Sequence, residues 1–365
     1  MNAMTVPEPP DWTRILAHFD IGAVRSLRPG GGTAAPKVLV ETDRGCFLLR
    51  ARRPQSSADD VVAFDHSLIR GLAEAGLPTV APLPCRPKPA SGYQARATWL
   101  RQGAVAYEAF PFIEGLEQFH PGDPDQIASA AQHLARLHRV TEHLRPEGHK
   151  PWRREHEIGT MAETLRRALE AAEAGHDRIH EAQGMLVAAE ALREQLTEEL
   201  VASLPRVIIH GDYTPANVMF RGSQVGGIFD FDWASYQPRL VDVGEALQFF
   251  AFRRETPIDP DSIWSLVQEW TPDDQGAHTF LRAYQSVWPL LPQEAQALPL
   301  FMCETWLGIR IRAMRKVEPG ERLRILTEGG LGPTRYLEQA AAHLRRLVEV
   351  TRPCATAGHT ASARG

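Results

Sequence analysis

The sequence predicts an α+β protein of two lobes, in which a small lobe of strands and one helix precedes a larger, mostly helical lobe. Residues 37–51 have the composition of a β-hairpin, and residues 57–75 have the periodicity of an amphipathic helix. Most of the chain beyond residue 124 is rich in residues that favour helices. Within that helical part, residues 206–230 form a second β-type stretch that carries several acidic side chains.

The length of 365 residues agrees with this division, since a domain typically has about 150 residues. We place the first lobe at residues 1–113 and the second at residues 114–350, because the character of the sequence changes around Gly115. Residues 351–365 are small, polar and without periodic apolar positions, so we expect a disordered tail there.

Each element of the first lobe has a local signal. The β-prone residues 37–42 and 46–51 flank an Asp-Arg-Gly turn, which is typical of a hairpin. The following helix has apolar residues at helical spacing and ends before Gly76, a residue suited to the left-handed conformation just after a helix. Two further β-type runs, residues 97–100 and 104–112, give the order strand, strand, helix, strand, strand.

The second lobe is predicted from helical periodicity interrupted once by strands. Residues 206–210 are a short apolar run of the β type that ends in His210. The predicted helical stretches of this lobe are residues 124–139, 156–200, 262–285, 293–316 and 335–350.

Composition excludes several classes of protein. The net charge is 40 − 45 = −5, so bulk charge does not predict nucleic-acid binding. No apolar run approaches the ~18 residues of a membrane span, and the first residues lack the pattern of a secretory signal. The four cysteines are far apart, which argues against a disulfide framework or a cysteine-rich zinc site. We therefore expect a soluble cytoplasmic protein with reduced thiols.

The strongest functional pattern begins where the run 206–210 ends. The chain delivers His210 and Asp212 to a loop, and Asn217 follows five positions after Asp212. A second short strand and a turn then lead to Asp230 and Asp232. The spacing H-x-D-x-x-x-x-N followed by D-x-D matches the catalytic loop and the metal-binding aspartate of kinases.

The chemistry of phosphoryl transfer explains these residue types. A carboxylate at Asp212 can accept the proton of the attacking hydroxyl. Mg²⁺ prefers oxygen ligands, which an amide at Asn217 and a carboxylate at Asp230 can provide. His210 is expected to brace the loop through hydrogen bonds, and whether Asp232 also binds metal stays open. The alternative interpretation is that the Asp and Asn side chains only stabilise turns or occupy a half-exposed strand.

Residues 210–220, His-Gly-Asp-Tyr-Thr-Pro-Ala-Asn-Val-Met-Phe, resemble the signature of the aminoglycoside phosphotransferase and choline kinase-like family. The run Ile-Phe-Asp-Phe-Asp-Trp-Ala at residues 228–234 and the run Arg-Leu-Val-Asp-Val-Gly at residues 239–244 resemble two further motifs of that family. Weaker similarity extends the resemblance over most of residues 30–250. The resemblance implies a protein-kinase-like fold with ATP, or sometimes GTP, bound in the cleft between two lobes.

The resemblance also implies roles for individual residues. Asp212 would be the catalytic base, and Asn217 and Asp230 would be the magnesium ligands. Asp242 would be a structural residue of the second lobe. The acceptor would be a small molecule with a hydroxyl group, such as an aminoglycoside, an amino alcohol, homoserine or a sugar.

Two positions depart from the family pattern. The family usually has Lys in the strand after the hairpin turn, where this chain has Arg50. The family helix usually offers Glu to pair with that Lys, and the nearest match here is Asp65. A shorter acid opposite a longer base can preserve the span of the pair, so we expect an Arg50–Asp65 pair that supports nucleotide binding. The alternative is that Arg50 belongs to a solvated basic cluster.

Two further segments are candidates for the nucleotide site. Gly31 and Gly32 belong to a glycine run that could lie over the phosphates, although such a run is often only a linker. No Walker A sequence is present. Phe110 and Phe112, at the lobe junction, could line the base pocket or equally form part of a core strand.

Taken together, the sequence predicts a Mg²⁺- and nucleotide-dependent small-molecule kinase that acts as a monomer or homodimer and binds neither nucleic acid nor membrane. The alternative is a weak or inactive kinase-like module that binds a nucleotide or a partner. A protein kinase is not indicated, because the D-F-G and A-P-E motifs are not visible.

Overall fold

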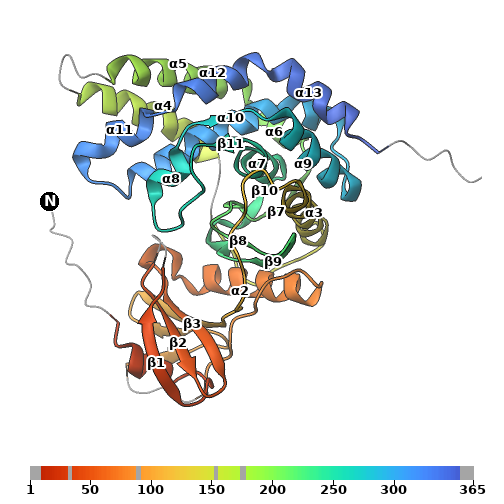
Figure 1. Cartoon of the computed structure of the whole chain (residues 1–365). Coiled ribbons are helices and arrows are strands. Elements are labelled where there is room, and N and C mark those ends of the chain that lie inside the picture. The colour runs from red at the N-terminus through yellow and green to blue at the C-terminus, as the bar shows by residue number, and fades with distance from the viewer. Residues whose placement is uncertain (1–9, 32–34, 88–91, 152–154, 173–177, 354–365) are drawn as a thin grey trace, which may run out of the picture.

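The computed structural model describes residues 10–31, 35–87, 92–151, 155–172 and 178–353. It has two lobes, as predicted, with a small lobe of strands below and a larger helical lobe above in Figure 1. The tail predicted for residues 351–365 lies almost wholly outside the described residues. No helix in the described ranges is long and apolar enough to span a membrane.

The small lobe is built on an antiparallel sheet with the strand order β1-β2-β3-β6-β5-β4. Its strands are β1 (Val24–Pro29), β2 (Lys37–Thr42), β3 (Gly45–Ala51), β4 (Gln94–Ala95), β5 (Leu100–Gln102) and β6 (Val105–Pro111). The predicted hairpin is confirmed as β2 and β3, and the predicted run 104–112 as β6. The predicted strand over residues 97–100 is wrong for most of its length, since β5 begins only at Leu100. Strand β1 was missed because all of its residues are exposed, so it has no alternation of apolar and polar positions.

The two faces of this sheet have different roles. Val38, Val40 and Leu49 point to a closed core beneath helix α1 (Trp12–Leu16). Leu48 and Arg50 lie on the opposite face, since side chains alternate along a strand. That second face is turned toward the large lobe, as the contacts of Arg50 described below show.

Helix α2 (Asp59–Glu74) lies between the sheet and the large lobe (Figure 1). Residues 142–151 of the large lobe pack along it. A side chain at Gly71 would meet Leu144, and one at Gly148 would meet the backbone of Asp60. These two glycines therefore allow the chain after α3 (Pro124–Thr141) to run close against α2.

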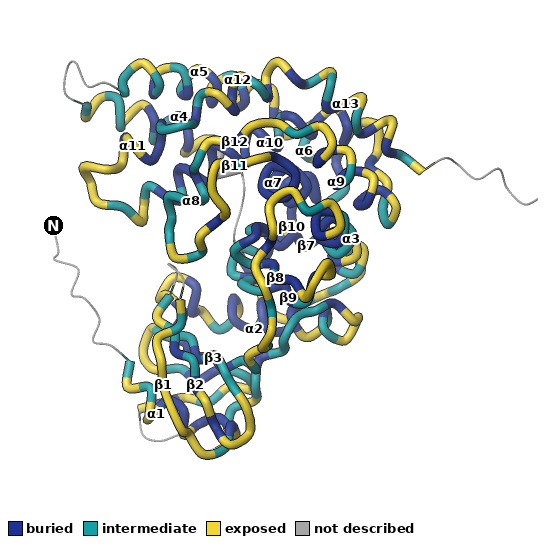
Figure 2. The backbone as a smooth tube through the Cα atoms, in the orientation of Figure 1, coloured by how far each residue is buried: buried dark blue, intermediate teal, exposed yellow. Residues whose placement is uncertain are grey.

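The large lobe forms one continuous core around the long helix α10 (Pro292–Met314), and Figure 2 shows the buried backbone gathered at its centre. The other helices are α4 (Glu155–Glu170), α5 (Ile179–Gln195), α6 (Glu198–Ser203), α7 (Leu240–Ala246), α8 (Ile263–Val267), α9 (Asp274–Val287), α11 (Arg322–Thr327), α12 (Leu331–Gln339) and α13 (Ala341–Val350). The strands are β7 (Arg206–Ile209), β8 (Val218–Arg221), β9 (Gln224–Ile228), β10 (Ser235–Pro238), β11 (Arg253–Arg254) and β12 (Trp270–Thr271).

One long helical prediction is wrong in detail. Residues 262–285 form α8, the short strand β12 and α9 instead of one helix. Pro272 has no backbone N–H to continue a helix, and the residues before it pair with β11. Strand β10, which pairs with β7, was also missed, because its sequence Ser-Tyr-Gln-Pro has no apolar run of the β type.

Candidate active site

The loop after β7 presents the two central polar residues of the motif. The side-chain nitrogen Nδ2 of Asn217 donates two hydrogen bonds to Asp212. One goes to the carboxylate oxygen Oδ2 at 2.8 Å and the other to the backbone carbonyl oxygen at 2.9 Å. The loop therefore brings these two predicted residues together. Since the Asn217 amide nitrogen faces Asp212, its amide oxygen is left for another partner, such as a cation.

Asp242 at the start of α7 holds this loop from below. Its carboxylate accepts hydrogen bonds from the backbone N–H groups of His210 at 2.6 Å and Gly211 at 2.8 Å. Nε2 of His138 lies 3.0 Å away on the other side. Asp242 is fully buried, and these contacts hold the backbone of the loop, as expected for a structural residue. His210 likewise braces the loop, with Nε2 2.9 Å from the carbonyl oxygen of Phe229.

The backbone is tight where the loop meets the acidic segment. Gly211 has φ +78°, and a Cβ there would lie 2.4 Å from the carbonyl oxygen of Trp233. Asp230 has φ 62° and ψ 69°, and among the described residues it alone has a positive φ without being glycine. Such strain clusters at functional sites, where the surrounding structure holds it in place.

Arg50 reaches across from the small lobe to the acidic segment. Its guanidinium lies 3.1 Å from Oδ1 of Asp230 and 2.7 Å from Oδ1 of Asp232. It also lies 2.5 Å from Oε1 of Glu108, the residue directly opposite it on β6. Arg50 is therefore not part of a solvated cluster, because three carboxylates surround it.

The expected Arg50–Asp65 pair is wrong. Asp65 on α2 instead contacts the guanidinium of Arg52 at 2.5 Å and the ammonium of Lys150 at 2.5 Å. Arg52 lies two residues after Arg50, past the end of β3, where it points to the same side but nearer to α2. Asp65 does pair with an arginine of this region, but that arginine is Arg52, and the register of β3 and β6 places Glu108 opposite Arg50.

Burial and charge shift the pKa values of the acids in opposite directions. Burial raises the pKa of Asp212, and the nearby charge of Asp230 raises it further, although Arg312 opposes both. Burial also acts to raise the pKa of Glu108, but Arg50 and Arg52 hold it well below its usual value. The site thus contains one carboxylate that gains basicity and one that stays ionised.

The face of the sheet beside Arg50 suits a flat apolar group. Leu48 lies opposite Phe110 in the register of β3 and β6, and both are half-buried. Phe112 follows on the same side and is 40% exposed. A cavity of about 380 Å³ opens at the outer end of this face, and it is lined by Ser26, Arg28, Leu39, Val40, Glu41, Cys46 and Glu114.

The glycine run is described only in part. Gly31 lies close to the large lobe, since a Cβ there would meet the carboxylate of Asp261 at 3.0 Å. Gly32 lies outside the described residues. The start of the run therefore approaches the cleft between the lobes.

The donor set fits a magnesium ion. Asp230 and Asp232 offer carboxylate oxygens, and Asn217 offers its side-chain amide oxygen, since its side-chain nitrogen is turned to Asp212. No group of three or more acidic, His or Cys side chains in the described ranges is arranged as a complete metal cage. The protein would therefore supply a few oxygens, and phosphates and water would complete the shell, as is usual for Mg²⁺.

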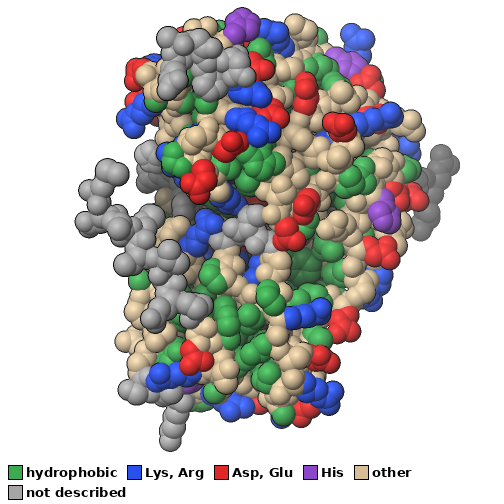
Figure 3. Space-filling view, turned by 60° about the vertical axis from the view of Figure 1, so that its left-hand side comes forward, with side chains coloured by type: hydrophobic (Ala, Val, Ile, Leu, Met, Phe, Trp, Pro, Cys, Tyr) green, Lys and Arg blue, Asp and Glu red, His purple; other side chains and the backbone are tan. Residues whose placement is uncertain are grey.

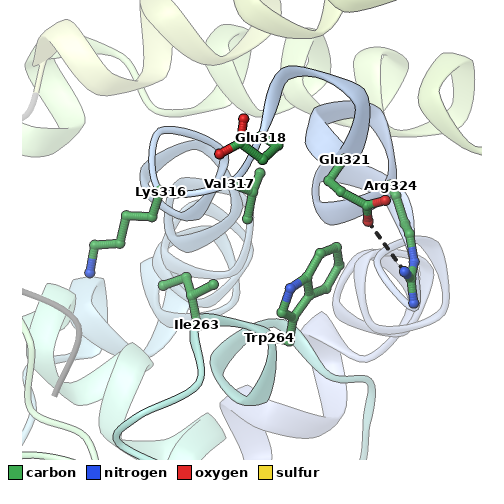
Figure 4. A pocket seen from close by; sticks show the side chains of 7 residues that line it. All are labelled: Ile263, Trp264, Lys316, Val317, Glu318, Glu321 and Arg324. Carbon is green, nitrogen blue, oxygen red and sulfur yellow. Dashed lines mark hydrogen bonds and ion pairs between the residues drawn. The ribbon is translucent and has the colours of Figure 1, made fainter. Parts of the chain in front are cut away.

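Cations from the end of α10 complete the surroundings of the catalytic loop. Arg312 lies 3.4 Å from Glu245, whose carboxylate accepts from the backbone N–H of Tyr213 at 3.0 Å. Lys316, one turn later, lines a cavity of about 560 Å³ between α8 and the connection from α10 to α11 (Figure 4). Figure 3 shows Lys and Arg side chains within the hollow between the lobes.

Sequence reasoning missed Glu108, Lys150 and Lys316. Each belongs to an element whose pattern gives no functional signal: an interior strand position, a loop and a helix end. The one available hint was Glu108 in an otherwise apolar strand, where a buried charge needs a partner.

The two lobes and the Asp212–Asn217 loop facing an acidic segment define a phosphotransferase of the protein-kinase-like fold. The chain belongs to the phosphotransferase enzyme family, whose model matches residues 26–291. Homoserine kinase of Phenylobacterium zucineum is 26% identical over 290 residues, which cover 79% of each chain. Homoserine kinase of Rhodopseudomonas palustris is 27% identical over 286 residues, 78% of this chain and 77% of the relative.

Solved structures share the fold at low sequence identity. An aminoglycoside phosphotransferase from Alicyclobacillus acidocaldarius has a TM-score of 0.62 and 16% identity, and the match covers 96% of this chain and 98% of the other. A microcompartment-associated aminopropanol kinase has a TM-score of 0.64 and 17% identity, with coverage of 92% and 98%. The predicted fold class and family are confirmed.

Proposed function

We propose that the protein transfers the γ-phosphate of ATP, or of GTP, to a hydroxyl group of a small acceptor, with Asp212 as the catalytic base. The observation that carries the proposal is the joining of the catalytic loop to the acidic segment. Asn217 donates to Asp212, and its backbone carbonyl oxygen accepts from the backbone N–H of Phe229, the residue before Asp230, at 2.9 Å. Arg50 from the other lobe contacts Asp230 at 3.1 Å. Three segments, around residues 50, 212–217 and 230, thus come together, which turn formation alone does not explain.

In this proposal Asp212 holds the acceptor hydroxyl in line with the γ-phosphate and accepts its proton. Burial raises the pKa of Asp212, which makes the carboxylate a better proton acceptor. Asn217 fixes its orientation through the hydrogen bond at 2.8 Å. A magnesium ion held by Asn217 and Asp230 would supply positive charge to offset the charge of the transferring group.

The nucleotide is assigned to the cleft face of the small lobe. Leu48, Phe110 and Phe112 offer apolar surface for the base. On nucleotide binding, Arg50 would exchange its ion pairs with Asp230 and Asp232 for contacts with the phosphates, while its ion pair with Glu108 would remain. Gly31 and Gly32 would cover the phosphates. Since nucleoside triphosphates are kept inside cells, we place the reaction in the cytoplasm.

The acceptor is proposed to be a small amino alcohol or hydroxy amino acid. The support is the similarity to proteins named homoserine kinase and the shared fold with an aminopropanol kinase. Homoserine is the first acceptor to test.

A turnover assay with Mg²⁺, ATP or GTP and a panel of hydroxyl compounds tests the proposal. We expect acceptor-stimulated nucleotide consumption, and a fall in kcat of about 10²–10⁴-fold in the Asp212→Asn variant. The matched control is Asp259→Asn, an exposed loop aspartate, which should retain activity. Nucleotide binding without turnover for any acceptor would instead favour the inactive, nucleotide-binding alternative.

A further inference from the structure

Lys37 is a second cation beside Arg50 on the cleft face of the small lobe. Strands β2 and β3 lie side by side (Figure 1), and their register pairs Lys37 with Arg50. Residues that face each other across antiparallel strands carry their side chains on the same face of the sheet. The next residue, Val38, belongs to the closed core, so Lys37 and Arg50 both project from the opposite face.

Lys37 also stands at the base of the loop that contains the glycine run. The backbone N–H of Gly30 donates to the carbonyl oxygen of Lys37 at 2.9 Å, so the two ends of the loop between β1 and β2 meet there. A Cβ at Gly30 would lie 2.8 Å from Cγ of Lys37, so the aliphatic stem of the lysine runs directly against the glycine. Through Gly31, the same loop approaches Asp261 of the large lobe.

The charge of Lys37 is not engaged by the described part of the chain. Its ammonium forms no hydrogen bond or ion pair with a described residue, although the side chain is half-buried. Arg50, by contrast, is surrounded by the carboxylates of Glu108, Asp230 and Asp232. A half-buried cation has lost part of its hydration, so an anion that enters the cleft can bind it without displacing another partner.

The acidic segment of the large lobe lies close to this pair of cations. Arg50, the neighbour of Lys37 across the two strands, contacts Asp230 at 3.1 Å. In agreement, burial lowers the pKa of Lys37, and the charge of Asp230 is the strongest of the influences that raise it. A triphosphate bound between the lobes at this point would therefore face two cations of the small lobe.

We propose that Lys37 is a further phosphate-binding residue of the nucleotide site, whose ammonium contacts the phosphates beside the guanidinium of Arg50. The inference rests on the proposed function and adds to it a residue that lies outside the catalytic motifs. Lysine commonly binds phosphate as a point charge. Arg50 must exchange two ion pairs to reach the phosphates, whereas Lys37 reaches them without breaking an ion pair with a described residue.

Nucleotide binding tests the inference without requiring turnover. The ligands are a non-hydrolysable ATP analogue and adenosine, which has the same base and ribose but no phosphate, each with Mg²⁺. Dissociation constants are measured on the full chain, by calorimetry for the analogue and by NMR for adenosine. Lys37→Met keeps an aliphatic stem without the charge, and Lys37→Arg keeps the charge. The control is Arg44→Met, which removes an exposed cation from the turn between β2 and β3.

The expected result is an effect on the phosphates alone. Lys37→Met should raise the dissociation constant of the ATP analogue about tenfold, a typical effect of losing a hydrogen bond to a charged group, and leave adenosine unchanged. Lys37→Arg should retain most of the affinity for the analogue, because a guanidinium also binds phosphate. Arg44→Met should change neither dissociation constant.

Three results would overturn the inference. The first is an unchanged affinity of Lys37→Met for the ATP analogue. The second is an equal weakening of adenosine, which would indicate a disturbed sheet, and the third is an equal effect of Arg44→Met, which would indicate bulk charge. All three leave the kinase proposal standing if acceptors stimulate turnover, whereas an affinity that depends on Lys37 without turnover for any acceptor would contradict the kinase proposal alone.

Discussion

Glu108 on β6 lies directly opposite Arg50 on β3, and its Oε1 is 2.5 Å from the guanidinium. Arg52 and His66 also approach the second oxygen of Glu108, at 3.4 Å and 2.6 Å. This fully buried carboxylate therefore takes the part that the sequence had suggested for Asp65 on α2.

The first prediction concerns nucleotide affinity. Glu108→Gln removes the charge that holds Arg50 in the cleft, so Arg50 should stay with Asp230 and Asp232. We expect the dissociation constant of an ATP analogue to rise about tenfold, the effect of about 1.4 kcal/mol. Asp65→Asn is the comparison, and it should weaken nucleotide binding less. If Asp65→Asn raised the dissociation constant of the ATP analogue more than Glu108→Gln does, the acid that supports nucleotide binding would be Asp65 on α2.

The second prediction concerns the connection between the lobes. Lys150 is buried, and its ammonium contacts Asp65 at 2.5 Å and the carbonyl oxygen of Phe231 at 3.1 Å. Lys150→Met leaves a buried carboxylate with one partner fewer, so we expect a loss of about 3 kcal/mol in the free energy of unfolding, measured with urea.

Arg70→Met is the control for Lys150→Met, since Arg70 links the same helix and segment through an exposed pair with Glu147 at 3.5 Å. Exposed pairs contribute less than about 1 kcal/mol. Equal losses for both variants would show that the Lys150 contact contributes no more than a surface pair.

The third prediction concerns stability in acid. Burial lowers the pKa of His138 below its usual value of about 6.5, so the folded state binds the proton less readily than the unfolded state. Stability is unaffected above that pH and falls as the pH drops below it, by up to about 1.4 kcal/mol per pH unit for one group. The fall ends at the lower pKa of the folded state.

The His138→Gln variant tests this pH dependence. It should be less stable at pH 7.5, because the ring no longer joins Asp242 at 3.0 Å and the Tyr284 hydroxyl at 2.8 Å. Its stability should also decline less steeply between pH 6.5 and pH 5, as measured by thermal unfolding. An unchanged slope would assign the acid sensitivity to other groups, among them the buried His18 and the half-buried His133, whose pKa values burial also lowers.

The fourth prediction separates strain from catalysis at Asp230. A non-glycine residue in the left-handed region costs about 1–2 kcal/mol. Asp230→Gly should therefore be more stable than Asp230→Ala by about 1 kcal/mol in urea unfolding. Both variants should lose phosphotransfer activity, because both lack the carboxylate. If Asp230→Gly were the less stable variant, the backbone at this position would not be strained.

The sequence was sufficient for the local parts of this protein. The hairpin of β2 and β3, the helix α2 and the loop from His210 to Asn217 follow from turn chemistry, periodicity and motif spacing, all of which act within a few residues. The exposed strand β1 and the short strand β10 were not predicted, since neither shows an alternation of apolar and polar residues.

What only the tertiary structure decided is which charges meet. Arg50 and Arg52 are two residues apart and chemically alike, yet one contacts Glu108 and the other Asp65. Their partners are set by strand register and by the approach of α2 and residues 142–151, which are long-range packing results. The sequence thus determined the chemistry that the site can offer, while the partners of Arg50 and Arg52 depend on contacts between distant segments, which no local pattern encodes.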